Sequence, residues 1–250
     1  RIYITEAGNS LLSYAIPVLE QCEEAKNVLR DTQKIIKLRL GTNHSFGMGN
    51  LSELLSGFQK QHSQIPVYTM VKNSGLIEEQ LLRNNLDIGI IDYPQNHTMF
   101  HCQMIGKERM VAAGSENLVK KYLHERSEFL GKGEQAQLEE IPFLIREQGS
   151  GSRTQVDTFF KENGIVPKIV MESDSIQCMI KAAIDGMGVL LLPQNVLTTY
   201  LKSGILCEMK IAGMEIQREY YLVYHKSKFL TKSMKVFLEY AEKKKGKQID

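Results

Sequence analysis

The first thirty residues carry a hydrophobic pattern typical of one long helix. Thr5 is a good helix cap and Glu6 suits a first turn, so the helix is expected to begin there. Its apolar positions follow one another at alternating steps of four and three residues, as in a coiled coil. These positions are Leu11, Ala15, Val18, Cys22, Ala25 and Leu29. The regular spacing favours pairing with a helix of a second chain over packing against the same chain.

One residue inside this pattern conflicts with a straight helix. Pro17 lacks the backbone N–H that would bond one turn back, and an interior proline costs roughly 3 kcal/mol. We therefore expect a kink near residues 13–17.

From residue 35 onward the pattern changes to short apolar runs separated by helical stretches. Helices are predicted at about 50–62 and 75–83, between strands at 35–40, 66–71 and 87–91. The same order returns later, with strands at 143–145, 168–171 and 189–192. Such alternation predicts parallel sheets covered by helices on both faces. We expect an α/β protein with two similar, Rossmann-like subdomains preceded by a long helix.

The remaining segments join these subdomains. A strand at 110–113 is expected to pass from one to the other, and strands near 206–211 and 220–224 precede a final helix at 231–242. The predicted division is residues 1–34 for the N-terminal helix, 35–112 with 221–250 for subdomain I, and 113–220 for subdomain II.

Small polar residues gather where the parallel strands of each subdomain are predicted to end. The first group comprises Thr42, Asn43, His44, Ser45, Asn73, Ser74 and Asp92. The second group comprises Gln148, Ser150, Gly151, Ser152, Arg153, Ser173 and Asp174. In open parallel sheets, ligands bind outside the carboxyl ends of the strands. We therefore expect the two groups to face each other across a cleft and to surround a small, polar, anionic molecule.

The stretch from Phe143 to Arg153 has the most specific chemistry. Gly149 and Gly151 place backbone amides and two serine hydroxyls at a helix start, where the helix dipole favours an anion. Arg153 can add a forked pair of donors. The alternative, that Ser150 or Ser152 only caps the helix, stays equally open.

Composition and charge exclude several classes of protein. A net charge of +2 over 250 residues lacks the basic excess of a domain that grips nucleic acid by itself. No apolar run is long enough to span a membrane and no export signal is evident, so we expect a cytoplasmic protein. The cysteines are widely separated and predict free thiols rather than disulfides. They are Cys22, Cys102, Cys178 and Cys207.

Catalytic and metal-binding motifs are weak. Gly-x-Ser-x-Gly and Gly-Lys-Ser/Thr are absent, and Gly47-Met-Gly49 lacks the third glycine of a dinucleotide loop. Asp92 could act as a base, but no nucleophile is paired with it. His97, His101 and Cys102 have spacing suited to a metal but no further partner, so a surface role is favoured. We expect no enzyme, metal or cofactor, with His44 serving as a neutral hydrogen-bond donor.

Three groups of residues together resemble a known family. They are Arg1-Ile-Tyr-Ile-Thr-Glu-Ala-Gly8 with Leu11-Leu12-x-Tyr14-Ala15; Gly41, Pro66 and Leu82 with Asp87-Ile-Gly-Ile90; and Gln148-Gly-Ser-Gly-Ser-Arg153 with Glu172-Ser173 and Ile184-Asp-Gly-Met-Gly-Val-Leu-Leu-Leu-Pro193. Over essentially the whole chain, the combination resembles the wing end, linker helix and two regulatory subdomains of LysR-type transcriptional regulators.

This resemblance implies a fold like that of type 2 periplasmic binding proteins. It also implies homodimers or homotetramers with paired linker helices, and effector positions at 42–45 and 148–153. The character of Thr42 to Ser45 is similar to regulators of sulfur assimilation, which suggests sulfate, thiosulfate or an acetylated serine. Because the chain starts about where the wing ends, operator DNA would be bound only through the missing N-terminal domain.

Two other functions remain as alternatives. A solute-binding receptor of a transport system would share the two subdomains, but it would not need the coiled-coil seam at 11–29. An enzyme on this fold would need a paired nucleophile and base, and none is evident in the sequence.

Overall fold

The structure, a computed structural model, describes residues 4–30, 37–128, 138–211 and 214–244. Its helices are α1 (Glu6–Arg30), α2 (His44–Gly49), α3 (Leu51–Gln61), α4 (Ser74–Leu82), α5 (Glu116–Glu128), α7 (Gly151–Glu162), α8 (Ile176–Ile184), α9 (Gln194–Lys202) and α10 (Lys232–Lys244). Its strands are β1 (Leu38–Thr42), β2 (Val67–Val71), β3 (Ile88–Asp92), β4 (Phe100–Gly114), β5 (Pro142–Arg146), β6 (Lys168–Ser173), β7 (Val189–Pro193), β8 (Cys207–Met209) and β9 (Gln217–His225).

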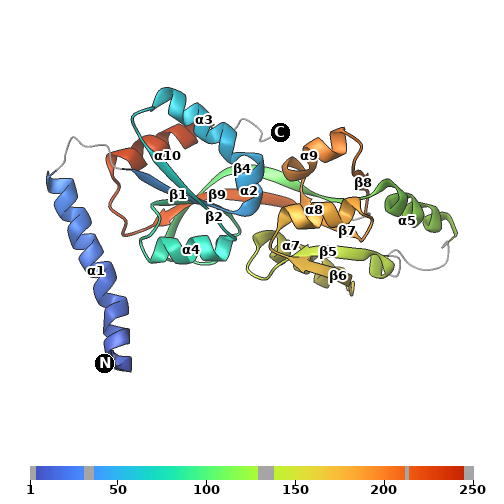
Figure 1. Cartoon of the computed structure of the whole chain (residues 1–250), viewed down its shortest axis with the longest axis horizontal. Coiled ribbons are helices and arrows are strands. Elements are labelled where there is room, and N and C mark those ends of the chain that lie inside the picture. The colour runs from blue at the N-terminus through green and yellow to red at the C-terminus, as the bar shows by residue number, and fades with distance from the viewer. Residues whose placement is uncertain (1–3, 31–36, 129–137, 212–213, 245–250) are drawn as a thin grey trace.

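The two halves of the molecule repeat one strand arrangement (Figure 1). In the first half, β1 lies between β2 and β3 and is parallel to both. In the second half, β5 lies between β6 and β7 and is again parallel to both. The first strand of each half is therefore central, as expected when right-handed crossovers place a helix on each face. This confirms the predicted repeat of strands and helices.

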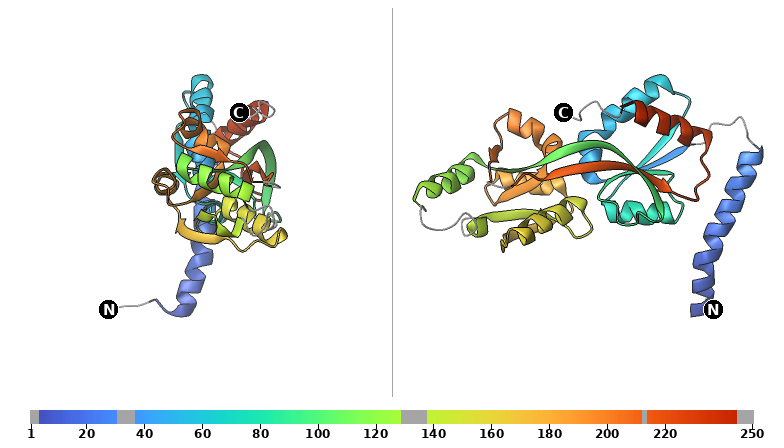
Figure 2. Two further views of the ribbon diagram at one scale, coloured as in Figure 1. Left: turned by 90° about the vertical axis from the view of Figure 1, so that its right-hand side faces the viewer. Right: turned by 180° about the vertical axis from the view of Figure 1, so that it is seen from behind.

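Two long antiparallel strands connect the halves. β9 pairs with β3 of the first half, and β4 pairs with β7 and β8 of the second. Between these ends, β4 and β9 pair with each other, with a register shift between Met104 and Gly106. They run the length of the body in Figure 2. The expected crossing strand at 110–113 is thus the end of a longer one, and the boundaries proposed for the subdomains remain predictions.

Alternating side chains of the strands build a core on each face of the sheet. In the first half, Leu38 and Leu40 pack with α2, α3 and α10, whereas Ile91 packs with α4 on the opposite face. In the second half, Phe143 packs with α5 and α7, whereas Leu144 packs with α8 and α9. Because successive residues of a strand point to opposite faces, a strand with consecutive apolar residues, such as Phe143-Leu144-Ile145, belongs inside a layered sheet.

Helix α1 extends away from this body (Figure 1). The Thr5 hydroxyl accepts a hydrogen bond from the Gly8 amide at 3.1 Å, which confirms the predicted cap. Helix α1 is continuous through Pro17, and the predicted kink remains a prediction. Several of its apolar side chains are exposed, including Leu11 at 68% and Val18 at 58%. Ala25 and Leu29 of the predicted seam lie outside the described side chains.

Two predicted loops turn out to be partly helical. His44 and Ser45 belong to the short helix α2, which the sequence did not indicate. The helix begins there because Asn43, directly after β1, caps it. Likewise, Gly151, Ser152 and Arg153 form the first turn of α7 rather than a loop before it. In α2, a capping side chain placed directly after β1 allows the helix to start without an intervening loop.

Candidate functional site

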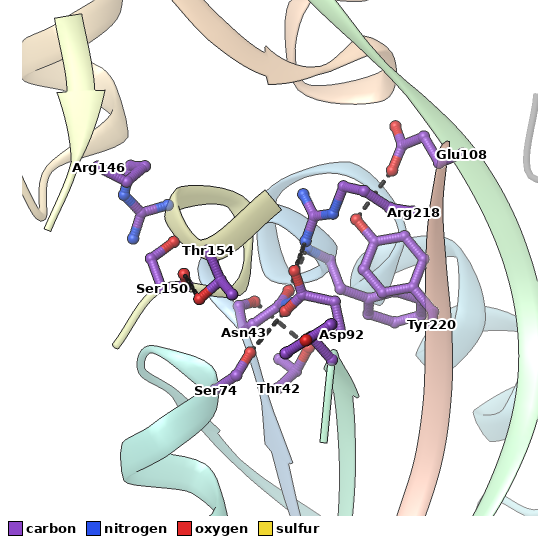
Figure 3. A network of polar contacts seen from close by, with 12 residues as sticks. Thr42, Asn43, Ser74, Asp92, Glu108, Arg146, Ser150, Thr154, Arg218 and Tyr220 are labelled. Carbon is purple, nitrogen blue, oxygen red and sulfur yellow. Dashed lines mark hydrogen bonds and ion pairs between the residues drawn. The ribbon is translucent and has the colours of Figure 1, made fainter. Parts of the chain in front are cut away.

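Asp92 lies at the centre of a buried polar network at the carboxyl end of β3. Its side chain accepts hydrogen bonds from Asn43 Nδ2 and from Ser74 Oγ, both at 2.6 Å. It also forms an ion pair with Arg218 of β9. Figure 3 shows these side chains converging on the Asp92 carboxylate. The site therefore joins the ends of β1 and β3, the start of α4 and a crossing strand.

These donors stabilise the ionised form of the Asp92 carboxyl. Burial alone would raise the pKa of this carboxyl, but the Arg218 charge and the hydrogen bonds from Ser74 and Asn43 lower it below its ordinary value. Asp92 is therefore an anion inside the protein.

Asn43 and Asn73 explain why two helices begin at this site. Asn43 Oδ1 accepts from the Phe46 amide at 2.9 Å and caps α2, while its Nδ2 holds Asp92. Asn73 Oδ1 accepts from the Leu76 amide at 2.9 Å and caps α4. Each asparagine satisfies an amide that the helix leaves unpaired. The polar residues predicted to contact a ligand thus also build the local structure.

The N-terminus of α7 brings the second half onto the same network. Gly151 lies against the Asp92 carboxylate, so that close approach requires the absence of a side chain. Beside it, the Gly75 amide donates to the Gly149 carbonyl at 3.5 Å, which links α4 to the loop before α7. A negative charge at a helix N-terminus is favourable. The anion beside this helix is therefore a carboxylate of the protein itself.

Not every residue predicted around α7 faces this network. Ser150 is buried at the cap position of α7, yet its side chain makes no capping hydrogen bond. Arg153 donates to Asp157, to Glu172 and to the Arg146 carbonyl, each at 2.8 Å. Its guanidinium is thus engaged within the second half. Direct effector contacts by Ser150 and Arg153 remain predictions.

The other predicted residues of the second half lie at turns. Ser173 Oγ accepts from the Ser175 amide at 3.1 Å, and Ser175 caps α8, as the polar turn there predicted. Gln148 precedes the cap of α7. The charge of Asp174 acts to raise the pKa of His44 in the first half.

His44 experiences charges from the second half. Burial and the positive charge of Arg146 lower the pKa of this imidazole, against the opposing effect of Glu147 and Asp174. This shift favours the neutral ring, and the role of His44 as a hydrogen-bond donor to an effector remains a prediction.

Sequence reasoning did not single out four residues of this region, which are Arg146, Glu108, Arg218 and Tyr220. Arg146 ends β5 and is buried, with a forked ion pair to Glu147 at 2.8 and 3.0 Å. Glu108, which faces Arg218 across the β4–β9 ladder, accepts from Tyr220 Oη at 2.8 Å and from the Asn195 amide at 2.7 Å. The available signal was weak, because β4 and β9 carry other charged residues, such as Lys107 and Glu219, beside Glu108 and Arg218. Without knowledge of the strand register, that signal could not pair Glu108 with Arg218 or bring either to Asp92.

Other chemistry finds little support within the described ranges. No group of three or more histidine, cysteine, aspartate or glutamate side chains gathers there in a manner suited to a metal ion. None of the helices described combines the length and apolar character needed to cross a membrane. All four cysteines are free thiols, as predicted.

Comparison with known proteins places this arrangement in context. The profile of a family described as "LysR substrate binding domain" matches residues 35–245. The RuBisCO operon transcriptional regulator of Acidithiobacillus ferrooxidans is 26% identical over 247 residues, covering 96% of this chain and 76% of that protein. The transcriptional activator CmpR of Synechocystis sp. (strain ATCC 27184 / PCC 6803 / Kazusa) is 28% identical over 245 residues, covering 96% and 77%.

Solved structures with the same fold are also similar. The effector-binding domain of QuiR in complex with shikimate has a TM-score of 0.72 at 20% identity, covering 86% of this chain and 99% of that one. The regulatory domain of Synechocystis PCC6803 CcmR in complex with 2-PG has a TM-score of 0.71 at 23% identity, covering 84% and 98%. Full-length CbnR with its target DNA has a TM-score of 0.70 at 18% identity, covering 98% and 83%.

Proposed function

Because this chain belongs to the family of LysR substrate-binding domains, we propose that it senses a small polar or anionic effector bound between its two halves. It is the effector domain of a LysR-type transcriptional regulator, with the α/β fold of such domains and an added N-terminal helix. The relatives compared above are transcriptional regulators, so the alternative of a transport receptor loses its support.

One observation supports the position of the effector. Strand ends and helix starts from both halves meet beside the paired strands β4 and β9, around Asp92, Gly151 and the Gly75–Gly149 contact. This is the edge of a parallel sheet at which α/β proteins bind ligands. A molecule held there touches both halves and so reports on their relative position.

Sensing follows if the effector binds one arrangement of the halves more tightly than another. The preferred arrangement then gains population by the ratio of the two affinities. Helix α1 is the element through which the change would reach a second copy, because its exposed apolar residues are spaced for helix pairing. We propose a homodimer or homotetramer on this basis.

The class of effector is proposed from the chemistry of the site. Buried hydroxyl, amide and guanidinium groups favour a compact molecule with several oxygen atoms. Sulfate, thiosulfate and acetylated serine are candidates from the sequence resemblance. Shikimate, a carboxylate bound by the QuiR domain, supports the inclusion of small carboxylates.

A thermal-unfolding screen of such metabolites tests the proposal. A ligand at a hundred times its dissociation constant should add about 2.7 kcal/mol to stability. Thr42→Val and Ser150→Ala, which remove buried hydroxyls from the two halves, should weaken the response to a hit. Thr158→Val removes an exposed hydroxyl of the same helix α7 and serves as the control. A hit whose binding is unchanged by both buried substitutions would place the effector elsewhere.

A further inference from the structure

Arg218 is a fully buried cation whose donors are mostly unused. A guanidinium has five N–H groups in a fixed planar fork. Nη2 pairs with Asp92, whereas Nε and Nη1 have no acceptor among the described residues. One face of the group lies over the Tyr220 ring, with Cζ 5.1 Å from its centroid. A buried donor without an acceptor is costly, so this arrangement calls for a further partner.

A partly buried Arg–Asp pair in the same chain provides a comparison for a structural contact. Arg39 donates to Asp87 through Nη2 at 2.7 Å and through Nε at 3.2 Å, and its backbone amide adds a third bond at 2.7 Å. There the fork is used on one carboxylate, as is usual for such pairs. Arg218 holds Asp92 through a single nitrogen although it is more deeply buried.

The remaining neighbours of Arg218 do not complete its coordination. Glu108 lies opposite in the strand register, but its two oxygens accept from Tyr220 and the Asn195 amide. Burial also raises the pKa of Glu108. Asp92 is shared with Asn43 and Ser74. Nε and Nη1 of Arg218 therefore keep N–H groups that no described residue accepts.

The surroundings of Arg218 suit an anion. The N-terminus of α7 lies against Asp92, the partner of Arg218, and contributes the positive end of its dipole. Figure 3 shows the start of α7 close to the Asp92 and Arg218 side chains. The guanidinium of Arg218 and the N-terminus of α7 thus lie on the same carboxylate.

We infer that Arg218 binds the anionic group of the effector, a carboxylate, sulfate or phosphate, and that Asp92 is the resident counter-ion with which this group competes. The inference rests on the proposed function and names the chemistry of that same site. Arg218 should therefore increase the affinity for the effector and Asp92 should decrease it, although the two residues form an ion pair in the fold.

Opposite effects on binding therefore distinguish this role from a structural one. Asp92→Asn removes the competing charge while keeping an oxygen acceptor for Asn43 and Ser74, so anions should bind more tightly, by several-fold. Arg218→Lys keeps the charge but loses the fork, so anions should bind about tenfold more weakly. A structural pair would respond to both changes in the same direction.

The test measures affinity for sulfate, phosphate and acetate by calorimetry at constant ionic strength. Acetamide, a neutral molecule of the shape of acetate, should not bind. Asp87→Asn and Arg39→Lys form a matched control, because they alter the partly buried Arg39–Asp87 pair and should leave anion affinity unchanged. Thermal unfolding of each variant verifies that the chain is folded. The Arg218 Nε–H signal in nitrogen-15 NMR, identified by its loss in Arg218→Lys, should shift when sulfate is added.

Two results separate this inference from the proposed function. If a screened metabolite binds the wild type but is indifferent to Arg218→Lys and Asp92→Asn, the inference is overturned and the effector site stands. If neither metabolites nor simple anions bind the folded wild type, both are wrong. Equal affinity for acetate and acetamide would also overturn the inference, as would an unmoved Nε–H signal at saturating sulfate.

Discussion

Gly151 of α7 and Asp92 of β3 touch across the junction of the two halves, so closely that a Cβ at position 151 would lie 2.3 Å from Asp92 Oδ2. The N-terminus of α7 in the second half therefore packs directly against the polar network of the first half. A larger residue at position 151 should therefore change how the two halves pack against each other.

Gly151→Ala should destabilise the chain by about 1–3 kcal/mol, because the added methyl forces Asp92 or α7 to move. Gly75→Ala is the matched control, since its methyl would meet the neighbouring loop at an ordinary 3.7 Å. Chemical unfolding measures both. Small-angle X-ray scattering should show a more extended particle for Gly151→Ala only. Equal stability of the two variants would argue against the close contact.

Asp87→Asn should destabilise the chain by about 3 kcal/mol at neutral pH, because Lys228 and Arg39 lose the carboxylate that neutralises them. Burial alone would raise the pKa of Asp87, but the hydrogen bonds from Arg39 and the charge of Lys228 hold it below its ordinary value of 3.8. The stabilisation is therefore present above pH 3.8 and lost as the pH falls through the lower, folded-state pKa.

Urea unfolding between pH 2 and pH 7 checks this prediction. The difference between wild type and Asp87→Asn should shrink in acid. Glu116→Gln, which removes an exposed ion pair with Lys120, should leave stability unchanged throughout. A difference that persists undiminished at the lowest pH would mean that the Asp87 charge is not responsible.

Glu108→Gln should gain stability relative to wild type as the pH rises. Burial raises the pKa of Glu108 above its ordinary value of 4.5, despite the Asn195 amide, the Tyr220 hydroxyl and the charge of Arg218, while Asp92 raises it further. Protonated Glu108 therefore stabilises the fold below pH 4.5, and this contribution is lost as the pH rises through the folded-state pKa. Glutamine does not ionise and avoids that loss.

The free energy of unfolding from pH 4 to pH 8 provides the measurement. The exposed substitution Glu242→Gln on α10 should follow the wild-type curve. A Glu108→Gln variant that loses stability relative to wild type toward alkaline pH would contradict the assigned direction.

Leu11→Asp combined with Val18→Asp should reduce the particle mass in light scattering to about half of the wild-type value or less, because charges cannot be buried in a helix seam. Both side chains are exposed in the single chain. Asn9→Asp combined with Glu20→Asp alters other faces of α1 and should leave the mass unchanged. If the wild type is already monomeric, the proposal that α1 pairs with a second copy of the chain is wrong.

Much of the architecture could be read from local patterns. Fully apolar runs such as Val189–Pro193 indicate strands buried on both faces, and the helices between such runs require parallel sheets. Start signals were equally local, since Thr5 and Ser175 cap helices at the predicted places. Helix α2 was missed because its six residues are too few to establish a periodic pattern.

The candidate site was only half accessible to such reasoning. Thr42, Asn43, Ser74 and Asp92 follow strands of one subdomain, so sheet topology predicts that they meet. Arg218 is 126 positions from Asp92 in the sequence, and nothing local distinguishes it from a solvated strand residue.

The sequence by itself determined the elements, their alternation and the sheet edge at which polar side chains collect, because periodicity and capping act over a few residues. The tertiary structure decided which charges meet there. Only the pairing of β9 with β3 and β4 brings Arg218 to Asp92, and only the docking of α7 places Gly151 on the same carboxylate. Contacts between distant segments depend on strand register and on how the two halves pack, and neither is encoded in any short stretch of the chain.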